Sequence, residues 1–276
     1  MLRDLKRSLF IALTSFKPGS IHRFVTDLEF ELRLLESIEL LDAMEVAYKR
    51  GRDLALGNID TRSLGIGVLI SDTARRSYEI TGQKPLIGLM AAAISLSTLD
   101  GYISISKERI LDSIGSLLTR TIYRTPAQDA RQLVELAEDV GLSKYVDFLA
   151  DSGFTKESIE YENRTLGDLF ELLSKIDTGF MLNLRDYSYL LRLSKDMHEY
   201  KNMMLASVKA YLTITGDILN VEEMKGIDLH DQSFLSKLST LDKKYRKLRD
   251  KLEGAVGGVF ISLYFLNNQK EPLNII

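Results

Sequence analysis

The chain has 276 residues, a formal net charge of −3, no cysteine and only four prolines, and its length suits one large domain or two small ones. Without cysteine it can form no disulfide, thiolate metal site or iron–sulfur cluster, and it has no thiol nucleophile. The 36 basic and 39 acidic residues exclude a globally basic nucleic-acid binder, although a local basic patch is compatible with this composition.

The positions of the prolines favour helices. Pro18, Pro85, Pro126 and Pro272 all lie at the edges of apolar periodic segments. Proline breaks a helix interior because it lacks an N–H and clashes with the preceding turn. We therefore predict an all-α fold, a single domain over residues 1–276 with about ten helices. A division into two domains at 151–163 is the alternative, although both halves have helical patterns.

The first two helices are predicted from apolar spacing. The spacing over 2–13 indicates a helix, because the apolar core at 9–13 is too short for a signal peptide. A long amphipathic helix is predicted over 27–50, starting with the capping-box pair Thr26 and Glu29 and ending at Gly51. Its apolar stripe consists of Leu28, Leu32, Leu35, Ile38, Leu41 and Val46.

The later helices are predicted over 64–78, 86–99, 107–119 and 127–140, from Thr165 onwards, over 187–213 and, after a break at 216–226, over 231–267. The apolar segments 64–80, 86–99 and 254–266 are expected to form a buried central cluster. Neither of the longest apolar stretches reaches the roughly 18 residues of a membrane-spanning helix, so we expect no membrane association and, by default, a cytoplasmic location.

The loop between the first two helices is the strongest candidate site. Its sequence, residues 16–23, reads FKPGSIHR and gathers three cationic or imidazole side chains before a helix start. Cations and free backbone N–H groups at such a point suit a phosphate, and acidic side chains behind them suit a magnesium ion that bridges phosphate oxygens. The candidate phosphate-binding residues are Lys17, Gly19, Ser20, His22 and Arg23, and the acidic pair is Asp27 and Glu29. An ordinary interhelical turn with a capping box is the alternative.

Other motifs give weaker indications. Gly65 and Gly67 lack the third glycine and the preceding strand of a dinucleotide-binding loop, so close helix packing is the better interpretation, as it is for Gly254, Gly257 and Gly258. The three histidines are not spaced as zinc ligands. The basic run 242–251 fits a solvated helix face better than a nucleic-acid surface.

At the lysine–proline–glycine loop the chain resembles the triphosphoribosyl-dephospho-CoA synthase family, and more closely its short archaeal-type homologues. The resemblance extends over roughly 12–266. It includes Leu64-Gly65-Ile66, Thr125-Pro126 with Asp129-Ala130, Thr165-Leu166 with Asp168-Leu169, and Gly216-Asp217.

The resemblance implies an all-α transferase that joins the ribose of ATP to dephospho-CoA and releases adenine, with Mg²⁺ on the polyphosphate. In that frame Lys17, His22 and Arg23 would hold phosphates, while Asp27 and Glu29 would bind metal or act with His22 in catalysis. The family's substrates make a nucleotide or CoA-type molecule the expected partner. A homodimer is left open.

Two segments depart from the family pattern. Thr61-Arg62-Ser63 stands where an Asn-Thr stretch is usual, and 255–259 lacks the usual acidic residue. The resemblance therefore also allows a divergent transferase acting on another phosphorylated ribosyl or nucleotide substrate. A catalytically inert helical binding or scaffold protein that retains the fold is the alternative from a different class.

Overall fold

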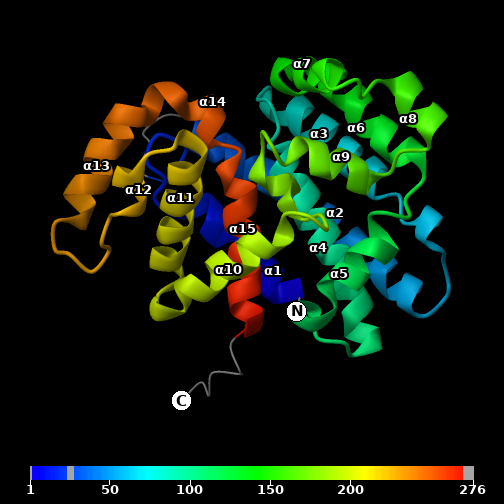
Figure 1. Cartoon of the computed structure of the whole chain (residues 1–276), viewed down its shortest axis with the longest axis horizontal. Helices are drawn as coiled ribbons and strands as arrows, with labels where there is room; N and C mark the ends of the chain where they lie inside the picture. Colours follow the sequence, from blue (N-terminus) through cyan, green and yellow to red (C-terminus); the bar gives the residue numbers. More distant parts are fainter. Residues whose placement is uncertain (1, 24–27, 270–276) are drawn as a thin grey trace.

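The chain forms helices and connecting turns throughout residues 2–23 and 28–269, which are the residues described by the computed structural model (Figure 1). These residues contain fifteen α-helices, two of them single turns, four short 3-10 helices and no strand, which confirms the all-α class with more helices than expected. The α-helices are α1 (Leu2–Thr14), α2 (Glu29–Ala55), α3 (Ile66–Thr81), α4 (Ile87–Ser106), α5 (Ile110–Thr121), α6 (Ala127–Asp139), α7 (Ser143–Asp151), α8 (Lys156–Glu162), α9 (Leu166–Leu173), α10 (Tyr187–Asp196), α11 (Met203–Leu219), α12 (Glu222–Lys225), α13 (Phe234–Tyr245), α14 (Arg249–Leu252) and α15 (Ala255–Gln269).

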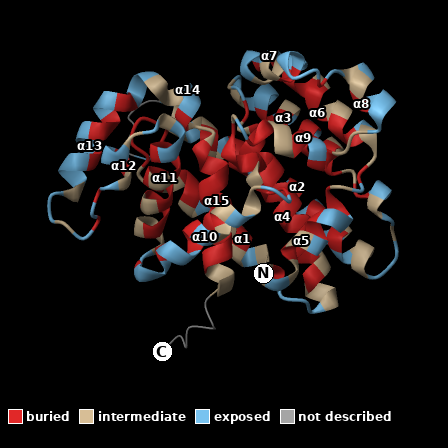
Figure 2. Ribbon diagram, viewed as in Figure 1, coloured by how far each residue is buried: buried red, intermediate tan, exposed pale blue. Residues whose placement is uncertain are grey.

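Two helices, α4 and α15, lie at the centre and are buried on nearly all sides (Figure 2). A helix that is apolar around its whole circumference must be covered on every side, which is why these two are surrounded by the others. Helices α11–α14 lie at one end of the molecule and α6–α9 at the other (Figure 1). The predicted central cluster is confirmed for 86–99 and 254–266, whereas α3 has one buried face only.

Two glycines let α2 and α4 touch, and they correct one predicted helix end. A Cβ added to Gly51 would lie 1.9 Å from the Thr98 carbonyl oxygen, and one added to Gly101 would lie 2.0 Å from the Tyr48 carbonyl oxygen. The prediction that the helix ends at Gly51 is therefore wrong: α2 continues to Ala55, and Gly51 serves the helix crossing.

The buried face of α2 is not the predicted one. Leu28, Leu35, Ile38 and Val46 are exposed, and the face that packs inward contains small and charged residues instead. The side that α3 and α4 cover decides which stripe is buried, and the close contact with α4 requires small side chains. The inward residues are Arg33, Glu36, Ser37, Leu40, Ala43, Met44, Ala47 and Gly51.

Other helix boundaries are confirmed in part. The helix predicted from Thr165 onwards is confirmed as α9, and Thr165 caps it in a reciprocal capping box with Asp168. The helix predicted over 107–119 begins later, at Ile110, because α4 continues to Ser106. The predicted helix over 187–213 is divided into α10 and α11 by a 3-10 turn at 197–199. Thr26, half of the predicted capping box of α2, lies outside the described residues.

One described helix, α4, is long and apolar enough to cross a membrane by length and composition alone. However, 89% of its apolar window is buried inside the fold, as in the core helix of a globular protein.

Candidate functional site

The predicted candidate loop contains a tight turn that packs against the far end of the chain. The Ser20 amide donates to the Lys17 carbonyl at 2.9 Å, and Gly19 has φ of +80°, the geometry of a type II turn after proline. A Cβ on Gly19 would lie 2.8 Å from Leu252 Cδ1 and 2.9 Å from Tyr245 Cβ. Glycine is therefore required both by the backbone conformation and by the contact with the 245–252 segment.

The Lys17 ammonium group points into the protein. Its Nζ donates to the carbonyl oxygens of Ala12 (2.9 Å), Leu13 (2.7 Å) and Ser15 (3.0 Å), and the residue is 1% exposed. An ammonium group has three donors, so these three bonds use all of them and cap the carbonyl end of α1. Burial lowers the pKa of Lys17 to about 7, against a smaller opposing effect of Glu253.

His22 is also held inside the fold. Its ring stacks on Phe16 with 4.2 Å between centroids, and its Nε2 lies 3.4 Å from Asp242 Oδ1. The same carboxylate oxygen accepts the Gly19 amide at 2.9 Å, while Asp242 Oδ2 accepts from Arg246 at 2.7 Å. Burial lowers the pKa of His22 despite the nearby carboxylate, which favours the neutral ring at pH 7.

The remaining predicted residues do not converge on an open site within the described part of the chain. Arg23 is exposed and Ser20 is buried, whereas Glu29 forms an ion pair with Arg249. Asp27, the other predicted magnesium ligand, lies outside the described residues. Beside Lys17 and Ser20 the fold leaves a cavity of about 10 Å³, which is roughly room for one water molecule.

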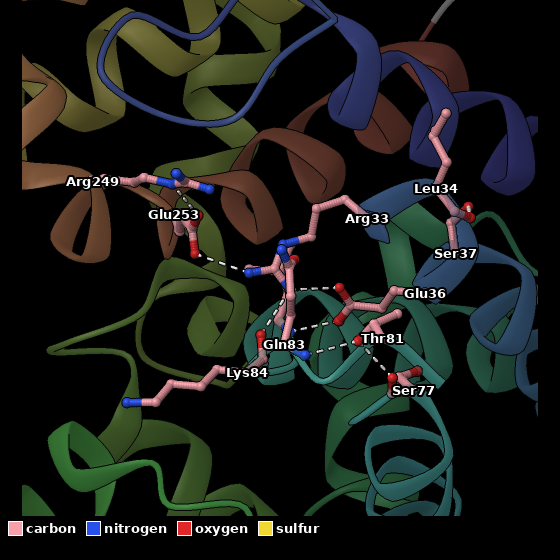
Figure 3. A network of polar contacts seen from close by, with 11 residues as sticks. Arg33, Leu34, Glu36, Ser37, Ser77, Thr81, Gln83, Lys84, Arg249 and Glu253 are labelled. Carbon is pink, nitrogen blue, oxygen red and sulfur yellow. Dashed lines mark hydrogen bonds and ion pairs between the residues drawn. The ribbon is translucent and has the colours of Figure 1, made fainter. Parts of the chain in front are cut away.

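A buried ion cluster occupies the space next to this loop (Figure 3). Arg33 Nη1 donates to Glu36 Oε2 and to the Lys84 carbonyl oxygen, both at 2.7 Å, and Nη2 donates to Glu253 Oε2 at 3.2 Å. Arg249 Nε donates to the other oxygen of Glu253 at 3.0 Å. The cluster therefore ties α2 to the start of α15 and to the connection between α3 and α4. It was not predicted, although Arg33 and Glu36 have the three-residue spacing of a helical ion pair.

The glycines at the start of α15 serve close packing, as their sequence context indicated. A Cβ on Gly257 would lie 2.4 Å from Gly179 Cα, and one on Gly258 would lie 2.5 Å from Thr178 Oγ1. The neighbouring Asp177 carboxylate is buried and accepts the Tyr145 hydroxyl at 2.5 Å. These contacts hold the start of α15 directly against the 3-10 turn Thr178–Met181.

A wide polar cleft lies elsewhere, at the starts of α6 and α9 and the 3-10 turn Thr61–Ser63. It has a volume of about 630 Å³, and its lining includes the exposed side chains of Arg62 and Arg124. Within the described residues neither guanidinium makes a hydrogen bond or a salt bridge. The rest of the lining is Asp60, Thr61, Tyr123, Thr125, Pro126, Asn163 and Thr165.

The chemistry of this cleft suits an anionic ligand. The one carboxylate in the lining belongs to Asp60, whose Oδ1 accepts hydrogen bonds from the Ser63 amide at 2.9 Å and from the Ser63 hydroxyl at 2.7 Å. These two hydrogen bonds lower the pKa of Asp60. The two arginines supply planar donor groups that match phosphate oxygens. The cleft was not predicted as a site, and its lining comes from four segments that are separate in the sequence, 60–62, 123–126, 163 and 165.

No three acidic or histidine side chains among the described residues gather as a metal-binding group. No family model matches the chain, and neither a curated protein nor a solved structure matches it.

Proposed function

We propose that the chain is a helical protein that binds a phosphate-bearing small molecule, a nucleotide or CoA-type compound, without transferring triphosphoribosyl groups at the lysine–proline–glycine loop. The hydrogen bonds of Lys17 support the proposal that the loop does not bind phosphate, because backbone carbonyl oxygens use all three donors of the ammonium group. A phosphate bound at the loop would have to break these hydrogen bonds. It would also have to enlarge the neighbouring cavity of about 10 Å³ many times over.

The arginine-lined cleft is the proposed binding site. A triphosphate or diphosphate needs several convergent donors, and Arg62 and Arg124 provide guanidinium groups without an ion pair among the described residues, beside the Thr61 hydroxyl. The hydroxyls of Thr125 and Thr165 already donate to the Ile122 carbonyl oxygen and to the Asp168 carboxylate. A cleft of about 630 Å³ is large enough for a ligand of nucleotide size. We expect the base or pantetheine portion to extend along the polar lining, while the arginines hold the phosphates.

The transferase is the second candidate, supported by the family resemblance around the 17–29 loop. It requires Lys17, His22 and Arg23 to reach phosphate, with Mg²⁺ held by Asp27 and Glu29. The cytoplasmic location remains a prediction in either case.

One experiment separates these candidates. The protein is incubated with ATP, Mg²⁺ and dephospho-CoA, and adenine is measured by chromatography. The proposal predicts no adenine above a protein-free control. Adenine release that is lost in Lys17→Met would overturn it in favour of the transferase.

Binding is tested separately by titration calorimetry with ATP and with CoA. The double variant Arg62→Ala/Arg124→Ala should weaken binding at least about tenfold, since a hydrogen bond to a charged group contributes about 1.5–3 kcal/mol. Arg192→Ala, an exposed arginine on α10, is the matched control and should bind as the unaltered protein does. No binding of either ligand would leave a scaffold protein with no phosphate ligand.

A further inference from the structure

An apolar pocket lies between α11, the first turn of α10 and the segment that follows α9, and we call it the α11 pocket. Its volume is about 320 Å³, and its apolar lining consists of Ile176, Met181, Tyr189, Ile214 and Ile218. Ile214 is 1% exposed and lies 3.1 Å from the position of a Cβ on Gly258, at the start of α15. Ile218, one turn further along α11, is 44% exposed. The pocket therefore reaches from the core to the surface.

Two carboxylates line the α11 pocket, and each already has donors. Asp217 accepts the Tyr189 hydroxyl at 2.7 Å through Oδ2 and the Lys225 ammonium group at 3.1 Å through Oδ1. Asp177 is 5% exposed and accepts the Tyr145 hydroxyl at 2.5 Å. Neither carboxylate is therefore left to hold a cationic ligand.

The hydroxyl groups of the lining are also engaged. Thr178 Oγ1 donates to the Gly254 carbonyl oxygen at 2.7 Å and accepts the Gly258 amide at 3.2 Å. Ser174 Oγ lies 2.7 Å from Asp186 Oδ2, to which it donates. Burying a polar group without a hydrogen bond is costly, whereas these groups keep their bonds when an apolar ligand covers them. The interior of the pocket therefore suits a hydrocarbon chain.

The exception is Lys175, at the rim of the pocket. This lysine is exposed, and its ammonium group makes no hydrogen bond or salt bridge to any residue of 2–23 or 28–269. A second cation lies beside it, because Lys144 Nζ donates to the carbonyl oxygen of the next residue, Ile176, at 2.8 Å. An ammonium group has three donors, so Lys144 keeps two of them. The rim therefore offers donors to an anion.

We propose that the α11 pocket binds an aliphatic carboxylic acid of medium chain length, with the chain against Ile214 and Ile218 and the carboxylate at Lys175. A water-sized group occupies about 30 Å³, so a pocket of about 320 Å³ holds roughly ten such groups, which matches a chain of about eight to ten carbons. This site goes beyond the proposed function, because none of its lining residues lines the arginine-lined cleft.

Titration calorimetry of the full chain with hexanoate, octanoate and decanoate tests the chain. Each added pair of methylene groups should tighten binding about tenfold, because burial of a methylene contributes a nearly constant free energy. Ile218→Glu places a carboxylate at the mouth of the pocket and should weaken decanoate binding at least about tenfold. Leu235→Glu, at a leucine of α13 that is 59% exposed, is the matched control and should bind as the unaltered protein does. A circular dichroism spectrum equal to that of the unaltered protein shows that each variant is folded.

The carboxylate is tested by comparing octanoate with 1-octanol, which has the same chain without the charge. Lys175→Met should weaken octanoate binding at least about threefold and leave octanol binding unchanged, because an exposed ion pair contributes modestly. Lys195→Met, at an exposed lysine of α10 outside the lining, is the control and should change neither.

Three results would overturn the proposal. They are no binding of decanoate at about 1 mM, affinities that do not change with chain length, and equal weakening of octanoate and octanol by Lys175→Met. The double variant Arg62→Ala/Arg124→Ala should bind decanoate as the unaltered protein does, and a loss there would place the carboxylate in the arginine-lined cleft instead. Failure of ATP or CoA to bind leaves these expectations unchanged, so the two proposals fail separately.

Discussion

Lys17→Met should change how the stability of the protein depends on pH. In the unfolded chain the ammonium group has its ordinary pKa of 10.5, whereas burial lowers the pKa of Lys17 to about 7 in the folded protein. Between these values the unfolded state binds more protons, so the free energy of unfolding contributed by this group increases with pH. The slope is about 1.4 kcal/mol per pH unit, with a total of about 5 kcal/mol as an upper bound.

Below pH 7 Lys17 is charged in both states, and its contribution to the free energy of unfolding is constant. Methionine has a similar length and no charge, so the variant lacks the pH-dependent contribution at every pH. It also leaves the carbonyls of Ala12, Leu13 and Ser15 without their donor. That loss lowers the stability of the variant by an amount that does not change with pH. The difference in free energy of unfolding, unaltered protein minus variant, should therefore be flat below pH 7 and rise between pH 7 and 10.5.

Urea unfolding followed by far-ultraviolet circular dichroism at five values between pH 6 and 10 measures this difference. Subtracting the two proteins removes the contribution of every other group that titrates in this range. Lys247→Met, at an exposed lysine that forms no salt bridge with any residue of 2–23 or 28–269, is the control and should show a flat difference. Parallel stability curves for the unaltered protein and Lys17→Met would refute the burial of this ammonium group.

Three further substitutions, one of them with a matched control, test the fold. Gly51→Ala places a Cβ 1.9 Å from the Thr98 carbonyl oxygen and should lower the free energy of unfolding by about 3 kcal/mol. The control Gly115→Ala, at a helix position where a Cβ meets no close atom, should raise it by about 0.5–1 kcal/mol. Equal effects of the two changes in urea unfolding would contradict the close contact between α2 and α4. Arg33→Met leaves the buried Glu36 carboxylate without its ion-pair partner and leaves Glu253 with Arg249 alone. The change should cost about 3–5 kcal/mol by the same assay, so a loss below 1 kcal/mol would argue against the cluster. Burial raises the pKa of Asp100 from 3.8 to about 6, so its stabilising contribution is lost as pH rises from 4 to 6. Asp100→Asn should then gain up to about 3 kcal/mol relative to the unaltered protein over that range, and thermal unfolding at pH 4 and pH 7 checks this change.

Local chemistry was sufficient to predict several features. The spacing of apolar residues and the boundary prolines predicted the helical class, and the segments 86–99 and 254–266, which contain no charged residue, were identified as the core. The Pro18–Gly19 pair predicted a turn, since proline fixes φ and glycine accepts the positive φ that follows. These features depend on a few neighbouring residues, which is why a single sequence reveals them.

Tertiary contacts decided the rest. The sequence indicated that α2 is a helix with an apolar stripe, but contact with α4 at Gly51 and Gly101 turned that stripe outward. The sequence likewise placed Lys17 in a tight turn, but packing of the 245–252 segment against that turn encloses its ammonium group. A helical period shows that one face differs from the other, and a charged residue near a turn shows that a cation is available. Which face of α2 is covered depends on α4, and whether the Lys17 ammonium group is enclosed depends on the 245–252 segment at the other end of the chain. Neither contact can be read from the residues next to the helix or the turn.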